Sequence, residues 1–307
     1  MEYRGLIETI PTDDRDYILG STSKLSTAVL QSDRNWLPFK PEKEIQRNNL
    51  FDTYGCVSFS RNNCLEIMEK RLYGTEFNRS DRFLVVASGT IPRMGNSMDK
   101  VAQTARKNGS VKEDRYTFSQ SMTENEYYQV IPQEIYIEAL TYKDLYEDQY
   151  EWVSWGGANK EKMWEALQYG PLQVSIQAYG QYMNGIYMPT GTQDTNHLVT
   201  LMYAVYNKEW IILDHYSNEI KTLDWNYYIG AAMRHNLVKR MFKLVKGDEK
   251  PEVYCIGADG KLRHIYNEAC FEEGKQSGFW GGFESVEVKP QAEVDALPKG
   301  HDVVFSL

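Results

Sequence analysis

The stretch Tyr54-Gly55-Cys56-Val57-Ser58-Phe59-Ser60 places one cysteine directly after a glycine. From Cys56 to Leu72, apolar residues recur at helical spacing, which predicts a helix with one buried face. The first turn of a helix lies at the positive end of the helix dipole, where negative charge is favoured. We therefore take Cys56 as the candidate nucleophile around which the chain is organised.

Two candidate partners of this thiol lie far downstream, in Asn196-His197 and Leu213-Asp214. An imidazole can take the proton of a thiol, and a carboxylate can hold that imidazole in the right tautomer. Taken singly, a cysteine on an apolar helix face is usually a core residue, and a histidine before a strand is usually structural. In this order, however, Cys56, His197 and Asp214 predict the site of a cysteine hydrolase.

Chain length and composition limit the classes of function. The chain has 307 residues, of which 42% are hydrophobic and 13% aromatic, which is typical of a folded protein with one larger and one smaller unit. A formal net charge of −9 argues against nucleic acid as a partner. No apolar run of about 18 or more residues occurs, so we expect no membrane insertion. Residues 1–6 lack the apolar core of a secretory signal, so we expect synthesis in the cytoplasm.

The cysteines predict neither a disulfide framework nor a zinc site, because they are few and no C-x-x-C pair occurs. We therefore expect no metal and no cofactor. Cys64 lies on the apolar face of the predicted helix and is expected to be a buried core thiol. His215 follows Asp214 on a strand, where successive side chains point to opposite faces, so we do not expect it to be the base.

Hydrophobic periodicity and turn residues predict the remaining elements. Helices are expected at residues 98–107, 159–169 and 268–273. Strands are expected at residues 83–86, 134–138, 172–178, 197–205, 209–213 and from 227 onward. Residues 251–266 read as a β-hairpin around Asp259-Gly260. This pattern predicts an α+β fold, with a small C-terminal α+β module at residues 246–307.

Over residues 12–240 the sequence resembles the papain-like cysteine peptidases. Cys56-Val57-Ser58-Phe59-Ser60 is similar to that family's Cys-Trp-Ala-Phe-Ser helix start, with Val57 in place of the tryptophan. Residues 95–98 and 107–113 resemble its glycine-rich substrate wall and its "NGG–E" turn, and residues 166–176 resemble its "GPV" strand entry. Gly185-Ile186-Tyr187 followed by Asn196-His197-Leu198-Val199 resembles "GIY…NHAV", where the histidine is the base.

Two further features extend this resemblance. The interval of 141 residues from Cys56 to His197 lies within the roughly 130–150 residues of papain-type enzymes. Residues 12–17 resemble the "P-D-x-R-D-Y" start of bacterial and viral members. The chain is therefore identified as a divergent bacterial or bacteriophage member of the family.

The resemblance implies a two-lobed papain-like domain at residues 1–245, with an N-terminal strap at 1–50, a helical first lobe and a β-barrel-like second lobe. It also implies a cysteine endopeptidase that acts on polypeptides. Cys56 would be the thiolate nucleophile, His197 the general acid and base, and Asp214 the orienting residue. The residues expected to bind the substrate are Gly95, Asn96, Ser97 and Asn196. Because only about 55 residues precede Cys56, we expect no inhibitory propeptide.

The sequence departs from the family pattern at the oxyanion hole. Leu50 stands six residues before the nucleophile, where the family has a glutamine whose amide stabilises the oxyanion. Asn49 is the preferred substitute on proximity, and Gln46 or Asn48 could serve if the loop is longer. Loss of such a donor typically lowers the rate by about 10²–10³. Asp214 also replaces the family's asparagine, a change that the imidazole tolerates.

These departures keep a second hypothesis open. The chain could be a catalytically weak or inactive papain-fold binding or structural protein, such as a virion or cell-surface component. The module at residues 246–307 would then dock on another protein or on a glycan.

Overall fold

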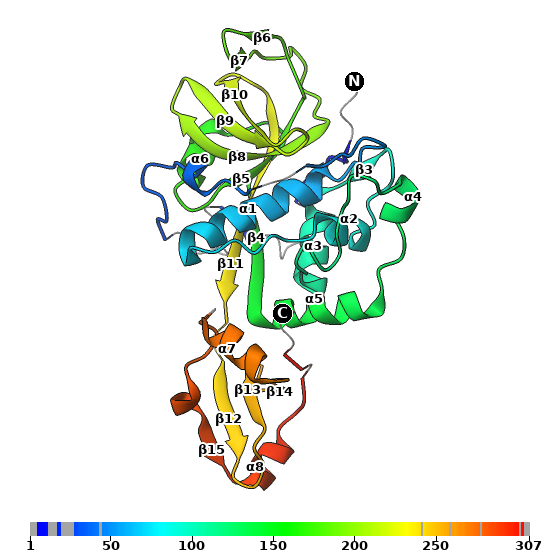
Figure 1. Cartoon of the computed structure of the whole chain (residues 1–307). Coiled ribbons are helices and arrows are strands. Elements are labelled where there is room, and N and C mark those ends of the chain that lie inside the picture. The colour runs from blue at the N-terminus through cyan, green and yellow to red at the C-terminus, as the bar shows by residue number, and fades with distance from the viewer. Residues whose placement is uncertain are drawn as a thin grey trace. The chain divides into compact units, whose positions relative to one another are not determined.

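The computed structural model describes residues 5–11, 17–19, 28–42, 45–240, 242–257, 259–276, 278–300 and 302–303. Residues 12–16, which carry most of the predicted leader motif, lie outside the described residues. Helices and strands are both well represented along the chain (Figure 1), and the predicted α+β fold class is confirmed.

The helices are α1 (Cys56–Tyr73), α2 (Asp81–Ala87), α3 (Met98–Asn108), α4 (Glu124–Tyr127), α5 (Gln133–Leu145), α6 (Lys160–Ala166), α7 (Glu268–Gln276) and α8 (Gln291–Ala296), with 3₁₀ turns η1 (Leu37–Phe39) and η2 (Phe283–Ser285). The strands are β1 (Gly5–Leu6), β2 (Tyr17–Ile18), β3 (Gly95–Asn96), β4 (Tyr146–Ser154), β5 (Leu172–Ile176), β6 (Tyr182–Met183), β7 (Ile186–Tyr187), β8 (His197–Val205), β9 (Glu209–Asp214), β10 (Glu219–Asp224), β11 (Ile229–Lys239), β12 (Lys243–Gly247), β13 (Val253–Ile256), β14 (Leu262–His264) and β15 (Glu287–Lys289).

The chain forms two compact units. The first comprises residues 1–105, 112–131 and 148–237, and the second comprises 106–111, 132–147 and 238–307. The second unit therefore contains the predicted module at residues 246–307 together with earlier segments of the chain. The proposed domain boundary at 245/246 stays a prediction.

The first unit is built around a nine-stranded sheet in the order β2-β4-β11-β5-β8-β9-β10-β7-β6. The four strands β5, β8, β9 and β10 are joined by antiparallel pairing. The sequence resemblance implied a barrel-like lobe, but among the described residues no pairing joins β2 to β6, so the sheet stays open.

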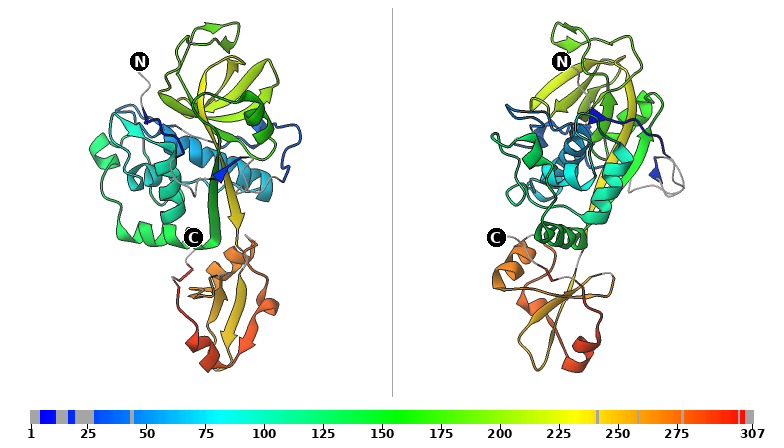
Figure 2. Two further views of the ribbon diagram at one scale, coloured as in Figure 1. Left: turned by 180° about the vertical axis from the view of Figure 1, so that it is seen from behind. Right: turned by 90° about the vertical axis from the view of Figure 1, so that its right-hand side faces the viewer.

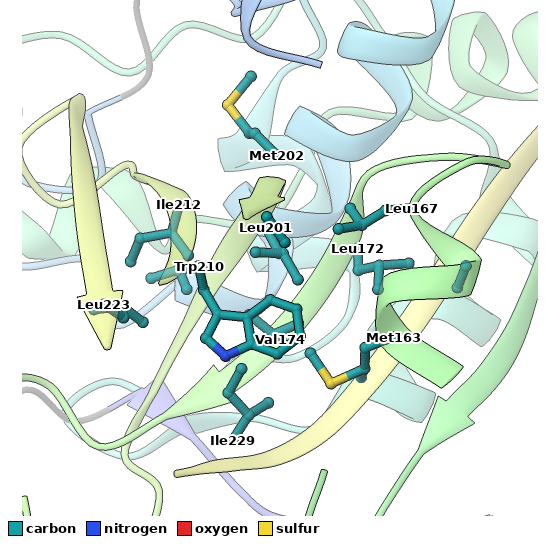
Figure 3. Close-up of a cluster of buried hydrophobic side chains, with 14 of the residues drawn as sticks. Met163, Leu167, Leu172, Val174, Leu201, Met202, Trp210, Ile212, Leu223 and Ile229 are labelled. Carbon is teal, nitrogen blue, oxygen red and sulfur yellow. The ribbon is translucent and has the colours of Figure 1, made fainter. Parts of the chain in front are cut away.

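An apolar cluster fills one side of this sheet, with Trp210 at its centre (Figure 3). The Trp210 ring stacks on Trp225 with centroids 4.1 Å apart, and its Nε1 donates to the Trp225 carbonyl oxygen at 3.1 Å. Because inward-facing residues of several strands meet here, the core fixes the register of β8 and β9, which carry His197 and Asp214.

Helix α1 lies beside β5 and β8 (Figures 1 and 2). The sequence predicted one buried face, but every residue from Cys56 to Glu69 is buried. Contacts inside the unit hold this helix: Arg61 forms an ion pair with Asp148, and Gln173 Nε2 donates to the Val57 carbonyl oxygen at 2.7 Å. This central position holds the first turn of α1 firmly against the sheet.

The second unit has a four-stranded sheet in the order β14-β13-β12-β15. The predicted hairpin is confirmed, since β13 pairs antiparallel with β14, and α7 begins where the sequence placed a short helix. Phe271, Phe279 and Trp280 belong to its apolar core. A Cβ atom at Gly274 would overlap the Trp280 ring, so this position accepts no side chain.

Two predicted strands are wrong. Residues 83–86 belong to α2, which is capped by Ser80 Oγ accepting from the Phe83 N–H at 3.0 Å. Residues 134–138 belong to α5, which follows Pro132 at its N-cap. Within the part of the chain that the structure describes, no helix is long and apolar enough to cross a membrane.

Candidate active site

Cys56 is the first residue of α1, directly after the N-cap Gly55. The Gly55 carbonyl oxygen accepts from the N–H groups of Ser58 and Phe59, at 2.8 and 3.1 Å. A Cβ atom at Gly55 would lie 2.5 Å from a methyl carbon of Val85, so only glycine fits at this turn. The sequence thus places the Cys56 thiol at a helix N-terminus, where the first backbone N–H groups have no intrahelical acceptor.

His197 opens β8 and Asp214 closes β9, so the antiparallel pairing of these two strands brings them to the same end. His197 Nε2 lies 3.0 Å from Asp214 Oδ1, and both side chains are buried. The Cys56 side chain also forms a hydrogen bond with His197. With Nε2 engaged by the carboxylate, Nδ1 is the ring nitrogen available to the thiol. The structure therefore brings the three predicted catalytic residues together in the expected order.

The electrostatic interactions among Cys56, His197 and Asp214 favour the charged form of the His197 imidazole. Burial alone would lower the pKa of His197, but hydrogen bonds to Asp214 and Cys56, and their charges, raise it to about 9. Burial opposes ionisation of Asp214, yet the hydrogen bond and charge of His197, helped by Lys221, hold the pKa of that carboxyl well below its usual range. The arrangement is suited to a thiolate–imidazolium pair.

His215 has the opposite character. Burial, together with the charge of His197, lowers the pKa of His215 to about 3, so the ring is neutral. It stacks on Phe59 with centroids 5.6 Å apart, and neither ring nitrogen has a hydrogen-bond partner among the described residues. This neutral ring lies beside His197, with the two ring centroids 5.4 Å apart.

The oxyanion candidates lie in different surroundings. Asn49 is exposed. Asn48 is buried, but its amide is used by the backbone: Nδ2 donates to Ser119 and Met122 carbonyl oxygens at 3.2 and 2.7 Å. Gln46 is also buried, and its backbone N–H donates to the His215 carbonyl oxygen at 2.9 Å. Of the three amides, Gln46 is thus the one tied to the segment that carries Asp214.

Asp52 is a neighbour of the site that the sequence did not reveal. Its Oδ1 accepts from Gln46 Nε2 at 2.8 Å and from the Tyr54 N–H at 2.8 Å. Burial raises the pKa of Asp52, against the hydrogen bond from Gln46 and the charge of His197. Asp52 therefore fixes the orientation of the Gln46 amide, whose Oε1 has no partner among the described residues.

The residues predicted to bind substrate have structural partners. Gly95 and Asn96 form β3, and Asn96 Nδ2 donates to Ser88 Oγ at 2.9 Å and to Thr90 Oγ1 at 3.1 Å. Ser97 is buried beside them. Asn196 Oδ1 accepts from the Ala178 N–H at 3.0 Å, which ties the chain before His197 to the end of β5. These contacts fix the position of Gly95–Ser97, the predicted substrate wall, and of the chain that leads into His197.

The thiol is covered by an earlier part of the chain, which we call the covering segment (residues 5–10). A Cβ atom at Gly5 would lie 2.9 Å from Cys56 Sγ, and Cys56 has no exposed surface. The sequence predicted no inhibitory propeptide because only about 55 residues precede Cys56, and motif spacing carries no information on where those residues fold. No group of three or more His, Cys, Asp or Glu side chains placed to hold a metal ion occurs among the described residues.

Comparisons with known proteins give structural similarity only. No family model matches the chain, and no curated protein matches it in sequence. The proform of Amb a 11, a ragweed pollen cysteine protease, is similar with a TM-score of 0.49 and 15% identity, over 67% of this chain and 65% of that one. A digestive procathepsin L 3 of Tenebrio molitor is similar with a TM-score of 0.47 and 18% identity, over 76% of each chain. Bromelain from Ananas comosus, in complex with the inhibitor E64, is similar with a TM-score of 0.47 and 16% identity, over 66% of this chain and 97% of that one.

Proposed function

We propose that the chain is a cysteine endopeptidase of papain-like type that acts on polypeptides. The observation that carries the proposal is the continuous hydrogen-bonded row from Cys56 at the N-terminus of α1 through His197 to Asp214. Such a row supplies a nucleophile, a proton carrier and an orienting carboxylate, which together are the requirements of acyl transfer through a thiol.

The chemistry would proceed in two steps. Cys56 Sγ attacks the scissile carbonyl carbon, and the C–N bond breaks as His197 gives its proton to the leaving amine. His197 then takes a proton from water, which attacks the thioester, releases the acid and restores the thiolate. Asp214 keeps the imidazole oriented in both steps. No cofactor takes part in this scheme.

The oxyanion would be held by two donors. The first is the backbone N–H of Cys56, which has no intrahelical acceptor at its position in α1. The second is the amide of Gln46, because Gln46 is buried and its contacts join it to Asp52 and to the His215 carbonyl. The exposed Asn49, preferred from the sequence, is better assigned to the loop surface.

Hydrolysis of fluorescently labelled casein, by the full chain and by a Leu6→Asp variant that weakens the pairing of β1 with β3, tests the proposal. We expect His197→Ala to abolish hydrolysis, while His215→Phe, a matched change in a neighbouring buried histidine, stays within severalfold of wild type. If both variants cleave as wild type does, the endopeptidase proposal is wrong.

A second candidate function is a papain-fold binding or structural protein. The observation that favours it is the closed state of the site, since Cys56 is fully buried under the covering segment. The expected bacterial or bacteriophage origin, the virion or cell-surface location and the docking role of residues 246–307 remain predictions. If the chain does not cleave casein, even after the covering segment is displaced, this second function is favoured.

A further inference from the structure

The Asp214 carboxylate has a third partner besides His197 and the backbone. Its Oδ1 accepts from His197 Nε2 and from the Tyr216 N–H, each at 3.0 Å, and its Oδ2 forms an ion pair with Lys221 of β10. The Asp214 side chain has no exposed surface, and the Lys221 side chain is 11% exposed. Both oxygens of this buried carboxylate are therefore occupied, and Lys221 supplies a positive charge at the oxygen that His197 does not contact.

The pairing of β9 with β10 brings Lys221 to this carboxylate. Lys221 lies opposite Ile212, so Asp214 is its diagonal neighbour on the same face of the sheet. Diagonal neighbours lie about 7–8 Å apart, a distance that a long side chain can span. Glu219 is directly opposite Asp214, and like charges at such a pair are destabilising. The Lys221 ammonium also lies 3.9 Å from the Glu219 carboxylate, so one lysine serves two carboxylates.

Two tyrosine rings hold the lysine in place. Its ammonium lies 4.3 Å from the centroid of the Tyr179 ring and 6.0 Å from that of Tyr187, and the two ring centroids are 4.7 Å apart. An aromatic face attracts an ammonium, more strongly where water is excluded, and this attraction offsets part of the cost of burying the charge. The Tyr179 ring also meets the His197 ring edge-on, with centroids 6.5 Å apart. Tyr179 therefore lies beside both side chains that contact Asp214.

The chain that carries Tyr179 is fixed by hydrogen bonds on both sides. The Ala178 N–H donates to Asn196 Oδ1 at 3.0 Å, and the Gly180 N–H donates to the Tyr227 hydroxyl at 3.0 Å. The backbone of Tyr179 is thus anchored to the segment before β8 and to the segment before β11. This anchoring keeps the ring against the lysine.

The charge of Asp214 distinguishes this site from the family pattern, which has a neutral asparagine at this position. A buried carboxylate stabilises an imidazolium more than a neutral amide does, and without a cation its charge would be costly to bury. A lysine in contact with the carboxylate brings the net charge of the pair close to zero. The aspartate and the lysine together can therefore take the place of the family's asparagine beside His197.

We propose that Lys221, held by the Tyr179 ring, is a positioning residue that seats the Asp214 carboxylate against His197 and balances its charge. The proposal rests on the proposed function, because it assigns a part in the same site. The contacts themselves are independent of catalysis and can be tested without a substrate.

Titration of the His197 ring by NMR in the full chain tests this role. Cys56→Ala serves as the background, so that the thiol does not titrate together with the ring. We expect Lys221→Met to raise the His197 pKa by about 1, because an uncompensated carboxylate favours the imidazolium. Lys208→Met, the same change in an exposed lysine that pairs with Glu209, is the matched control and should leave the His197 pKa unchanged.

The other titratable and charged groups near His197 and Asp214, which Lys221→Met leaves in place, are Asp52, Tyr179, Tyr187, His215, Tyr216 and Glu219.

Further variants in the same background separate charge from hydrogen bonding. Lys221→Arg keeps the charge and should keep the His197 pKa, whereas Lys221→Gln keeps a donor without the charge and should raise the pKa as methionine does. Asp214→Asn should lower the pKa, and Asp214→Asn combined with Lys221→Met should return it close to the background value. Tyr179→Leu removes the ring that holds the ammonium and should raise the pKa by less than Lys221→Met does.

The pH dependence of casein hydrolysis, measured with Cys56 in place, gives a second readout. The alkaline limb of the kcat/KM profile reports loss of the essential proton of the free enzyme, which the proposed function assigns to His197. This limb should move up by about 1 pH unit in Lys221→Met and should stay in place in Lys221→Arg and Lys208→Met.

The outcomes separate this role from the proposed function. An unchanged His197 pKa in Lys221→Met and Lys221→Gln, with native circular dichroism, would overturn the positioning role. A loss of stability without the expected pattern of His197 pKa values would overturn it as well. The expected pattern in a chain that cleaves no casein would support the positioning role and sink the endopeptidase function. Lys221→Gln and Tyr179→Leu keep the test decisive if Lys221→Met does not fold.

Discussion

Helix α1 carries two buried thiols, Cys56 in its first turn and Cys64 in its third. The difference between them shows what makes a thiol suitable as a nucleophile. Cys56 and Cys64 both have no exposed surface. Cys56 stands at the helix N-terminus and hydrogen-bonds His197. Cys64 lies within the helix, where burial raises its pKa far above the usual range, and the charge of Arg61 offsets this only partly. Burial alone therefore makes a thiol inert, and a charged partner at a helix end makes it a candidate nucleophile.

The sharpest way to break this contrast is to remove each thiol in turn. We expect Cys56→Ala to lower kcat/KM for casein by at least about 10³, because the covalent route is lost. Cys64→Ala should stay within severalfold, since this thiol serves only as packing. The measurement is initial rates at matched concentrations of folded protein. Comparable losses in the two variants would mean that the position on the helix does not matter.

The next contrast concerns the loop that precedes α1. We expect Gln46→Ala to lower kcat by about 10²–10³, the usual cost of losing one oxyanion donor. Asn49→Ala, a matched amide removal three residues away on the exposed loop, should leave kcat close to wild type. An oxyanion donor acts mainly on kcat. A change in kcat with little change in KM would therefore identify Gln46 as that donor. If Asn49→Ala is the variant that loses kcat, the assignment of the amide is reversed.

The smallest expected effect is on the free energy of unfolding, whose pH dependence differs between the two histidines of the site. The pKa of His197 is raised from 6.5 to about 9, so its contribution to stability is complete below pH 6.5 and is lost as pH rises toward 9. The pKa of His215 is lowered from 6.5 to about 3, so its contribution is complete above pH 6.5 and is lost as pH falls toward 3. Stability from this pair is therefore highest near pH 6.5.

Urea unfolding of wild type, His197→Gln and His215→Phe between pH 4 and pH 9 tests these signs. We expect His197→Gln to flatten the alkaline decline and His215→Phe to reduce the acid decline. Part of the acid decline should persist in His215→Phe, because the pKa of Asp214 is also depressed in the fold. An alkaline decline that persists in His197→Gln would contradict the paired imidazolium.

The parts of the site that the sequence predicted are those encoded in short local patterns. The glycine before Cys56 and the helical spacing after it fixed the first turn of α1, and two apolar runs placed His197 and Asp214 at strand ends. Local periodicity is strongest for long elements with a regular pattern, which is why these boundaries agree with the structure.

The remaining features depend on contacts between distant segments or on weak local signals. The run at residues 83–86 has β-branched residues and reads as a strand, but the cap of Ser80 and packing in the first unit make it helical. Lys221 and Asp52 are ordinary charged residues in the sequence, and only the fold brings them to Asp214 and Gln46. The covering segment likewise owes its place to a glycine pair 90 residues apart.

The attachment of residues 5–10 to the same chain changes the concentrations at which a competitor could act. A tethered ligand is present at an effective concentration on the order of millimolar, whatever the concentration of the protein. A free peptide with the same few contacts would have to approach that concentration to replace it. Modest contacts therefore suffice to keep β1 paired with β3 beside Cys56.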